Sequence, residues 1–132
     1  MRSDYLLNQG VLSAPALTLD SAQTDNSGLL QGADALSLSG SQLNNLAGGT
    51  LSSNNGFSLN FQTLDNGGLI SSGATLTLGG RSLTNRGEIN AANLTALNET
   101  IGNSQGGSLL AEHRLQLNNN ALDNSGKIAA IR

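Results

Sequence analysis

Several residue types are missing or scarce in this chain of 132 residues, and each absence argues against a particular class of structure or function. There is no cysteine, which excludes disulfide bridges and thiolate metal sites. Only six residues are lysine or arginine, the net charge is −3, and no basic stripe forms, so nucleic acid is not expected as a partner. No apolar run has the length of a transmembrane helix, so the chain is not expected to span a membrane.

Aromatic and charged residues make up only 2% and 11% of the chain. A globular protein of this size usually fills its centre with aromatic side chains, whereas here leucine must fill the interior, with Phe57 and Phe61 as exceptions. So few charges and aromatics would fit a disordered chain, but the strict aliphatic periodicity argues against disorder.

Glycine recurs along the chain at steps of 18 to 21 residues, and each of these glycines is followed two positions later by leucine or isoleucine. A fixed period near twenty residues is the signature of a solenoid, in which similar coils stack on one another. A leucine-rich repeat is disfavoured because its Leu-x-Leu-x-x-Asn order is missing. The residues that share one position in successive coils are called a row below, and the glycine row is Gly10, Gly28, Gly49, Gly68, Gly87, Gly107 and Gly126.

A row of asparagines precedes the glycines. Stacked side-chain amides can donate and accept hydrogen bonds along the stack, so the sequence predicts an asparagine ladder that satisfies polar groups at a corner of every coil. Replacing Asn66 or Asn85 with leucine is then predicted to lower the melting temperature by several degrees. The ladder comprises Asn8, Asn26, Asn45, Asn66, Asn85, Asn103 and Asn124.

Apolar residues alternate with polar ones in three short segments of each repeat, as in Leu64-x-Asn66, Ile70-x-Ser72 and Leu76-x-Leu78. Such alternation predicts strands with one buried face, and asparagine and glycine, which tolerate positive φ, fit the corners between them. We therefore predict an all-β parallel β-helix that forms one domain over residues 1–132. It would have about seven coils of 18–21 residues, three short strands per coil, and a rise of roughly 4.8 Å per coil.

The segments Leu64-Asp65-Asn66-Gly67-Gly68-Leu69-Ile70 and Leu122-Asp123-Asn124-Ser125-Gly126-Lys127-Ile128 resemble haemagglutinin repeats, and the resemblance covers nearly the whole chain. This family comprises filamentous haemagglutinins and contact-dependent growth-inhibition exoproteins of Gram-negative bacteria. The resemblance implies a right-handed parallel β-helix in a long surface filament that two-partner secretion exports through an outer-membrane transporter. Repeat-like sequence directly follows Met1-Arg2-Ser3 without a signal peptide, so the chain is interpreted as a fragment of the central shaft.

Two longer repeats carry extra residues at Ala47-Gly48 and Ser104-Gln105, and again around Asn54-Asn55 and Glu112-His113-Arg114. These insertions predict bulged corners or small loops. We take Glu112, His113 and Arg114 as the candidate contact protrusion, with His113 as a solvent-facing corner residue rather than a metal ligand.

Three further motifs are interpreted as structural. Arg86-Gly87-Glu88 looks like an integrin-type tripeptide but contains a glycine of the row, and the sequons at Asn93 and Asn98 fit chance in a chain rich in asparagine and threonine, with Leu94 pointing inward. A row of mostly hydroxyl side chains lies between the two apolar residues of each Leu-x-Leu segment. Its residue types vary too much from coil to coil for ice binding, and it is interpreted as a polar outer face. Its members are Thr18, Ser37, Ser58, Thr77 and Thr95, followed by Gln116.

The leading hypothesis is a structural and adhesive shaft segment at the bacterial surface, without a catalytic residue, cofactor or metal ion. It would stack on neighbouring coils of the full-length exoprotein and present distal receptor-binding or toxin regions, with adhesion to a host or bacterial receptor or glycan. A carbohydrate-active β-helix enzyme is one alternative, although it needs clustered acids and Glu88, Glu99 and Glu112 lie on different repeats. A glycan- or receptor-binding module is the other. The excised shaft would expose unpaired strand edges at Leu6–Leu19 and Leu115–Ile131, so end-to-end association is a hazard.

Overall fold

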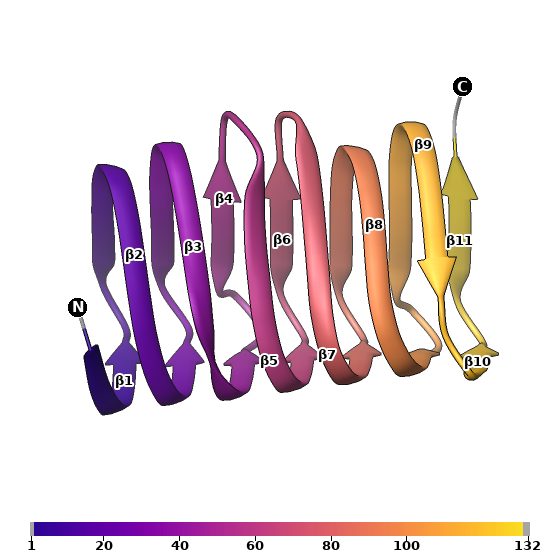
Figure 1. Cartoon of the computed structure of the whole chain (residues 1–132), viewed down its shortest axis with the longest axis horizontal. Helices are drawn as coiled ribbons and strands as arrows, with labels where there is room; N and C mark the ends of the chain where they lie inside the picture. Colours follow the sequence, from indigo (N-terminus) through magenta and orange to yellow (C-terminus); the bar gives the residue numbers. More distant parts are fainter. Residues whose placement is uncertain (1, 131–132) are drawn as a thin grey trace.

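The computed structural model describes residues 2–130, which form eleven strands and no helix (Figure 1). All strand pairs are parallel and belong to one continuous sheet that winds into a solenoid of about seven turns. This confirms the predicted all-β solenoid. The strands are β1 (Arg2–Asn8), β2 (Val11–Asn26), β3 (Leu29–Asn45), β4 (Thr50–Ser53), β5 (Phe57–Asn66), β6 (Leu69–Ser72), β7 (Thr75–Asn85), β8 (Glu88–Asn103), β9 (Ser108–Asn118), β10 (Ala121–Asn124) and β11 (Lys127–Ala130).

The pairing register follows the repeat. Leu64 pairs with Leu83, and Leu83 pairs with Ile101, so this apolar row occupies adjacent layers as predicted. In Figure 1 the nearer segments run downward and the fainter, more distant ones run upward while the chain advances from left to right. The coil is therefore right-handed, and the two termini lie at opposite ends of the stack.

The strands are longer than the three short segments predicted for each coil. β2, β3 and β8 each pass through more than one corner without a break, whereas β4 and β5, and β6 and β7, are separated by loops. A strand can bend through a corner and keep its hydrogen bonds because the coil above bends at the same place. The chain does break after each asparagine of the ladder, between β1 and β2 for example.

The interior is a continuous column of aliphatic side chains. Leu30, Leu51, Ile70 and Ile89 are 0% exposed, and the rows of paired leucines are equally buried in the central coils. Leucine and isoleucine together fill this space, which explains how the chain can do with so few aromatic residues. The column opens at its ends, where Leu6, Leu12, Leu17, Leu115, Leu117 and Ile128 are only partly buried.

One inward row was not recognised in the sequence, because its members differ in type. Gly40 pairs with Phe61, and Gly80 pairs with Asn98, so these residues share one corner. Phe61 is 1% exposed, and a Cβ atom on Gly40 would lie 3.0 Å from its ring. The glycines therefore leave room for the phenyl ring and for the close approach of the coils. A glycine 19 to 21 residues on either side of Phe61 was the available signal.

The glycine row is explained by packing between coils, and the predicted positive φ is wrong. Positive φ occurs only at Gly40, Gly48, Gly80 and Gly106 among the described residues, and at no asparagine. In the row, a Cβ atom on Gly68 would lie 2.3 Å from the carbonyl oxygen of Gly49, and one on Gly87 would lie 2.2 Å from that of Gly68. From Gly28 onward, any side chain in this row would collide with the backbone of the preceding coil.

The asparagines form hydrogen bonds from coil to coil. Nδ2 of Asn66 donates to Oδ1 of Asn85 at 2.8 Å, and Nδ2 of Asn85 donates to Oδ1 of Asn103 at 2.9 Å. From Asn8 to Asn103, each Nδ2 also donates to a carbonyl oxygen of the next coil, as from Asn66 to Glu88 at 3.1 Å. The ladder thus satisfies backbone acceptors at the corner as well as the amides themselves.

The two insertions before the glycine row form tight turns. The amide of Gly49 donates to the carbonyl of Leu46 at 2.8 Å, and Gly48 between them has φ +87°. The amide of Gly107 donates in the same way to Ser104 at 2.8 Å, and Gly106 has φ +88°. Both are turns of type II, whose third residue requires positive φ.

Ser53 and Ser72 pair with each other on adjacent coils and offer a matched test of buried hydroxyl groups. Ser53 Oγ is buried without a hydrogen-bond partner, whereas Ser72 Oγ donates to the Asn55 carbonyl at 2.9 Å and accepts from the Ala74 amide at 3.2 Å. We expect Ser53→Ala to raise the free energy of unfolding by about 1 kcal/mol and Ser72→Ala to lower it by about as much. Denaturant melts of both variants would measure this, and two changes of the same sign would contradict it.

Candidate functional site

The acidic residues lie apart on the surface of the stack. Asp65 accepts two hydrogen bonds from Arg86 Nη2, each 2.9 Å long, and Glu99 lies 3.6 Å from Arg81 Nε. Glu88 accepts from Asn90 at 2.6 Å. Among residues 2–130, no three histidine or acidic side chains gather where they could hold a metal ion.

The predicted contact protrusion is a bulge inside β9. Ala111 pairs with Ala91 and Arg114 pairs with Asn93, so Glu112 and His113 together oppose a single residue of β8. All three side chains of Glu112-His113-Arg114 are exposed. The predicted bulge and the solvent-facing position of His113 are confirmed, and the structure places two acid–base groups and one guanidinium together at one corner.

A second protrusion is the loop between β4 and β5, one of two loops that rise above the other coils in Figure 1. Asn54 and Asn55 are exposed there, and Asn55 Nδ2 donates to the Asp34 carbonyl at 3.2 Å. This loop lies three coils away from Glu112-His113-Arg114 along the stack, so the two insertions form separate protrusions.

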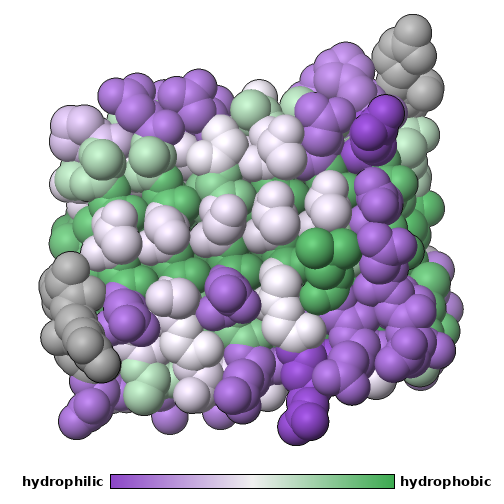
Figure 2. Space-filling model, in the orientation of Figure 1, coloured by the Kyte–Doolittle hydropathy of each residue, from purple (hydrophilic) through white to green (hydrophobic). Residues whose placement is uncertain are grey.

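The hydroxyl row lies in register on the face that Figure 2 shows. Thr18 pairs with Ser37, Ser37 with Ser58, and Ser58 with Thr77. Figure 2 shows bands of hydrophobic residues on this face, separated by a row of intermediate hydropathy that runs along the stack. The outward positions two residues before and after each member of the row hold no charged residue between Ala35 and Leu97. The predicted outer face is therefore uncharged and regular over its four central coils.

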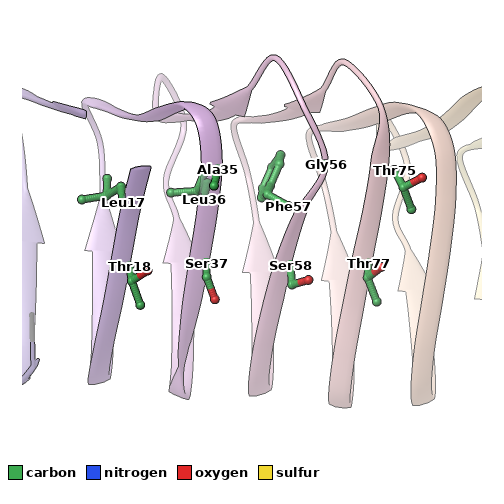
Figure 3. A pocket seen from close by; sticks show the side chains of 10 residues that line it. All are labelled: Leu17, Thr18, Ala35, Leu36, Ser37, Gly56, Phe57, Ser58, Thr75 and Thr77. Carbon is green, nitrogen blue, oxygen red and sulfur yellow. The ribbon is translucent and has the colours of Figure 1, made fainter. Parts of the chain in front are cut away.

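A hollow of about 310 Å³ lies beside the hydroxyl row (Figure 3). Ala35 and Gly56 line it where larger outward side chains are missing, and Ser37, Ser58 and Thr77 lie in line along it. The sequence pattern identified the hydroxyl row, but it did not indicate the hollow, which arises because two small residues become neighbours only after the coils stack.

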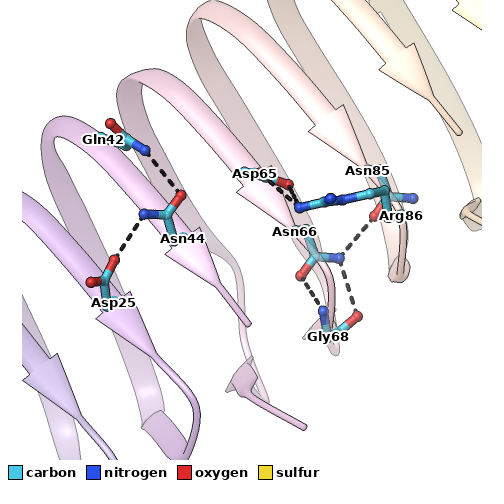
Figure 4. A network of polar contacts seen from close by, with 8 residues as sticks. All are labelled: Asp25, Gln42, Asn44, Asp65, Asn66, Gly68, Asn85 and Arg86. Atoms are coloured by element: carbon cyan, nitrogen blue, oxygen red, sulfur yellow. Dashed lines mark hydrogen bonds and ion pairs between the residues drawn. The ribbon is translucent and has the colours of Figure 1, made fainter. Parts of the chain in front are cut away.

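A polar network connects the first three coils on another face. Tyr5 Oη donates to Asp25 Oδ2 at 2.7 Å. Asn44 Nδ2 donates to Asp25 Oδ1 at 2.8 Å, and Gln42 donates to Asn44 at 3.1 Å (Figure 4). The hydrogen bond from Asn44 holds the pKa of Asp25 below its usual value, and those from Tyr5 and Gln23 act in the same direction while slight burial opposes them. The hydrogen bond to Asp25 raises the pKa of Tyr5, with further contributions from desolvation and from the charge of Asp25.

Tyr5 is the only tyrosine and there is no tryptophan, so its titration can be followed by ultraviolet absorbance without overlap. We expect its midpoint to lie above that of free tyrosine, and Asp25→Asn to return it toward that value. The Tyr5 contact stabilises the fold at neutral pH and is lost as the pH rises through the raised pKa. The Asp25 contacts are lost as the pH falls through the lowered pKa. A midpoint unchanged by Asp25→Asn would contradict the assignment.

The structure places the other sequence motifs at structural or buried positions. Arg86 pairs with Asp65 and Gly87 packs against the backbone of Gly68, which places the Arg86-Gly87-Glu88 tripeptide at a structural corner. Leu94 is 0% exposed, as predicted, and Asn98 is only 4% exposed, so the second sequon is inaccessible. No helix of residues 2–130 has the length and hydropathy needed to cross a membrane.

Comparison with protein-family models, with curated proteins and with solved structures finds no match to this chain.

Proposed function

We propose that this chain is a non-enzymatic shaft segment of a large bacterial surface filament. The observation that carries the proposal is the repetition of one interior through every coil: the asparagine ladder runs from Asn8 to Asn124 without a gap, and the aliphatic column runs beside it. A structure in which every coil repeats the same interior can act as a spacer, because each added coil lengthens it by roughly 4.8 Å.

The cellular context of the proposal comes from the haemagglutinin-like repeats. The shaft would be secreted through the outer-membrane transporter of a two-partner system and would lie outside the outer membrane. It would stack on neighbouring coils of the full-length exoprotein and hold a receptor-binding or toxin region away from the cell. The lack of cysteine is compatible with passage through an envelope in an unfolded state.

The second candidate is a receptor- or glycan-binding module, and the exposed bulge at Glu112-His113-Arg114 favours it. Charged, solvent-exposed side chains on a rigid β-helix can contact a partner at little conformational cost, since the backbone is held by neighbouring coils. The two proposed functions differ in one expectation: a binding module would bind cells through the Glu112-His113-Arg114 bulge by itself, and a shaft segment would not.

A binding assay separates these functions. Beads coated with the chain are incubated with host and bacterial cells, and the soluble chain is incubated with acidic and neutral glycans. A shaft segment that leaves adhesion to a distal region is expected to retain no more cells than beads coated with an unrelated protein, and to release no reducing or unsaturated sugar ends. Cell retention that is lost when Glu112, His113 and Arg114 are all changed to alanine, but kept when Asn54 and Asn55 are changed, would establish the module. Cleavage of a glycan by the chain would contradict the proposal of a non-enzymatic shaft.

A further inference from the structure

The dipeptide Asn-Gly occurs twice in this chain, at Asn55-Gly56 and at Asn66-Gly67. The side-chain amide of an asparagine can react with the backbone nitrogen of the residue that follows it, and glycine hinders the approach least because it has no Cβ atom. The reaction needs an accessible side chain and a following N–H group that is not held in a hydrogen bond. The two dipeptides therefore allow a direct comparison within one fold.

Asn55 meets both requirements. Its side chain is exposed in the loop between β4 and β5, where Nδ2 donates to the Asp34 carbonyl at 3.2 Å. Gly56 lies where this loop descends to Phe57, the first residue of β5 (Figure 3). Among residues 2–130, no acceptor receives the N–H group of Gly56. The nitrogen that would react is therefore not held by the fold.

Asn66 precedes a glycine as well, but its environment is the opposite. Its side chain is 0% exposed, and Nδ2 donates to Oδ1 of Asn85 at 2.8 Å within the ladder. The N–H group of Gly67 donates to the carbonyl of Asn45 at 2.7 Å. Both groups that would react are held in hydrogen bonds between coils, so a reaction at Asn66 requires the coils to open locally.

We propose that Asn55 is a site of spontaneous modification, where the folded chain converts asparagine to aspartate and isoaspartate. The Gly56 nitrogen loses its proton to hydroxide and forms a bond to Cγ of Asn55, while Nδ2 takes up a proton from water and leaves as ammonia. Water then adds to one of the two carbonyl carbons of the resulting succinimide and breaks its bond to the nitrogen. Opening at Cγ gives aspartate, and opening at the main-chain carbonyl gives isoaspartate.

The surroundings of the loop favour the reaction and tolerate its products. Ser72 Oγ donates to the main-chain carbonyl of Asn55 at 2.9 Å, which stabilises the negative charge that spreads to this oxygen when the Gly56 nitrogen loses its proton. Packing requires the glycine, because a Cβ atom on Gly56 would lie 2.8 Å from the Thr75 carbonyl oxygen. Residues 54–56 lie outside the strands, so the extra backbone carbon of isoaspartate leaves the register unchanged.

Ageing the whole folded chain at mildly alkaline pH tests the proposal. Chymotrypsin cleaves after Phe57 and Leu64, so the peptides that contain Asn55 and Asn66 can be separated and quantified by mass spectrometry. Asn55 is expected to react about a hundredfold faster than Asn66, because the reaction at Asn66 must wait for local opening. The rate at Asn55 is expected to rise in proportion to the hydroxide concentration. Each modified chain gains one negative charge, which anion exchange detects.

The unfolded chain and two variants provide the controls. In denaturant both dipeptides are expected to react at similar rates, since only the fold distinguishes them. Asn55→Gln is expected to stop the charge gain, because glutamine would have to close a six-membered ring, which forms far more slowly. Asn54→Gln, at the neighbouring exposed position, should react like the unchanged chain. The proposal is overturned if Asn55 stays intact in the folded chain, if Asn66 reacts there as fast as Asn55, or if Asn55→Gln gains charge at the rate of the unchanged chain.

Discussion

Replacing Asn66 with leucine is expected to lower the free energy of unfolding by about 3 kcal/mol, which corresponds to a loss of about 10 °C in melting temperature for a chain of this size. Asn66 is 0% exposed and is bonded in both directions along the ladder. Its Oδ1 accepts from Asn45 at 2.8 Å and from the Gly68 amide at 3.3 Å, and its Nδ2 donates to Asn85 at 2.8 Å and to Glu88 O at 3.1 Å. Leucine has the same number of side-chain heavy atoms, branched at the same position, but it leaves these buried partners without a hydrogen bond.

The control for this substitution is Asn60→Leu, which makes the same chemical change at an exposed position on the outer face. It is expected to change the melting temperature by no more than about 2 °C, since no buried group loses a partner. Thermal melts followed by circular dichroism would measure both variants. If Asn66→Leu melted together with Asn60→Leu, the ladder would contribute no more than a surface amide and its assigned role would be wrong.

Gly80→Ala is expected to be at least as damaging, with a loss of about 3–5 kcal/mol. A Cβ atom at this position would lie 1.7 Å from the carbonyl oxygen of Phe61 in the preceding coil. Gly80 also has φ +140°, a conformation that residues with a side chain rarely adopt. The two coils would have to separate at this corner, which would open the packing around Phe61.

Gly102→Ala provides the comparison, because the nearest atom to its added Cβ would be the Leu83 carbonyl oxygen at 4.0 Å. It is expected to be neutral or slightly stabilising, since alanine restricts the unfolded chain more than glycine does. Denaturant unfolding of both variants would test whether the close approach of coils at the Phe61 corner limits stability. Equal free energies of unfolding for the two variants would contradict that explanation.

Much of the fold could be predicted because this sequence repeats. Residues about one period apart, such as Leu64, Leu83 and Ile101, are chemically alike, and stacking like on like buries every one of them with the same geometry. The parallel register, the buried rows and the bulge at Glu112-His113-Arg114 all follow from the spacing. Phe61 shows the opposite case, since its row also contains glycine and asparagine, and no similarity between its members pointed to a shared corner.

The candidate surfaces were predictable to a smaller extent. Exposure of His113 follows from an insertion in a regular repeat, because extra residues in one coil have no partner in the next. The network of Tyr5, Asp25 and Asn44 depends on which outward residues meet across coils, where unlike side chains are tolerated and no periodicity marks the contact.

The amino-acid sequence alone established that this protein is a stacked β-coil with an aliphatic interior and a row of asparagines, because periodic burial of like residues leaves few other arrangements. Its right-handedness was established by the structure. Three-dimensional packing settled why glycine is required in its row, as shown by the 2.3 Å separation between a Cβ on Gly68 and the Gly49 oxygen. It also settled the direction of the ladder. The first depends on distances between the backbones of adjacent coils, and the second depends on which backbone carbonyls each side-chain amide faces. A linear pattern of residue types contains neither.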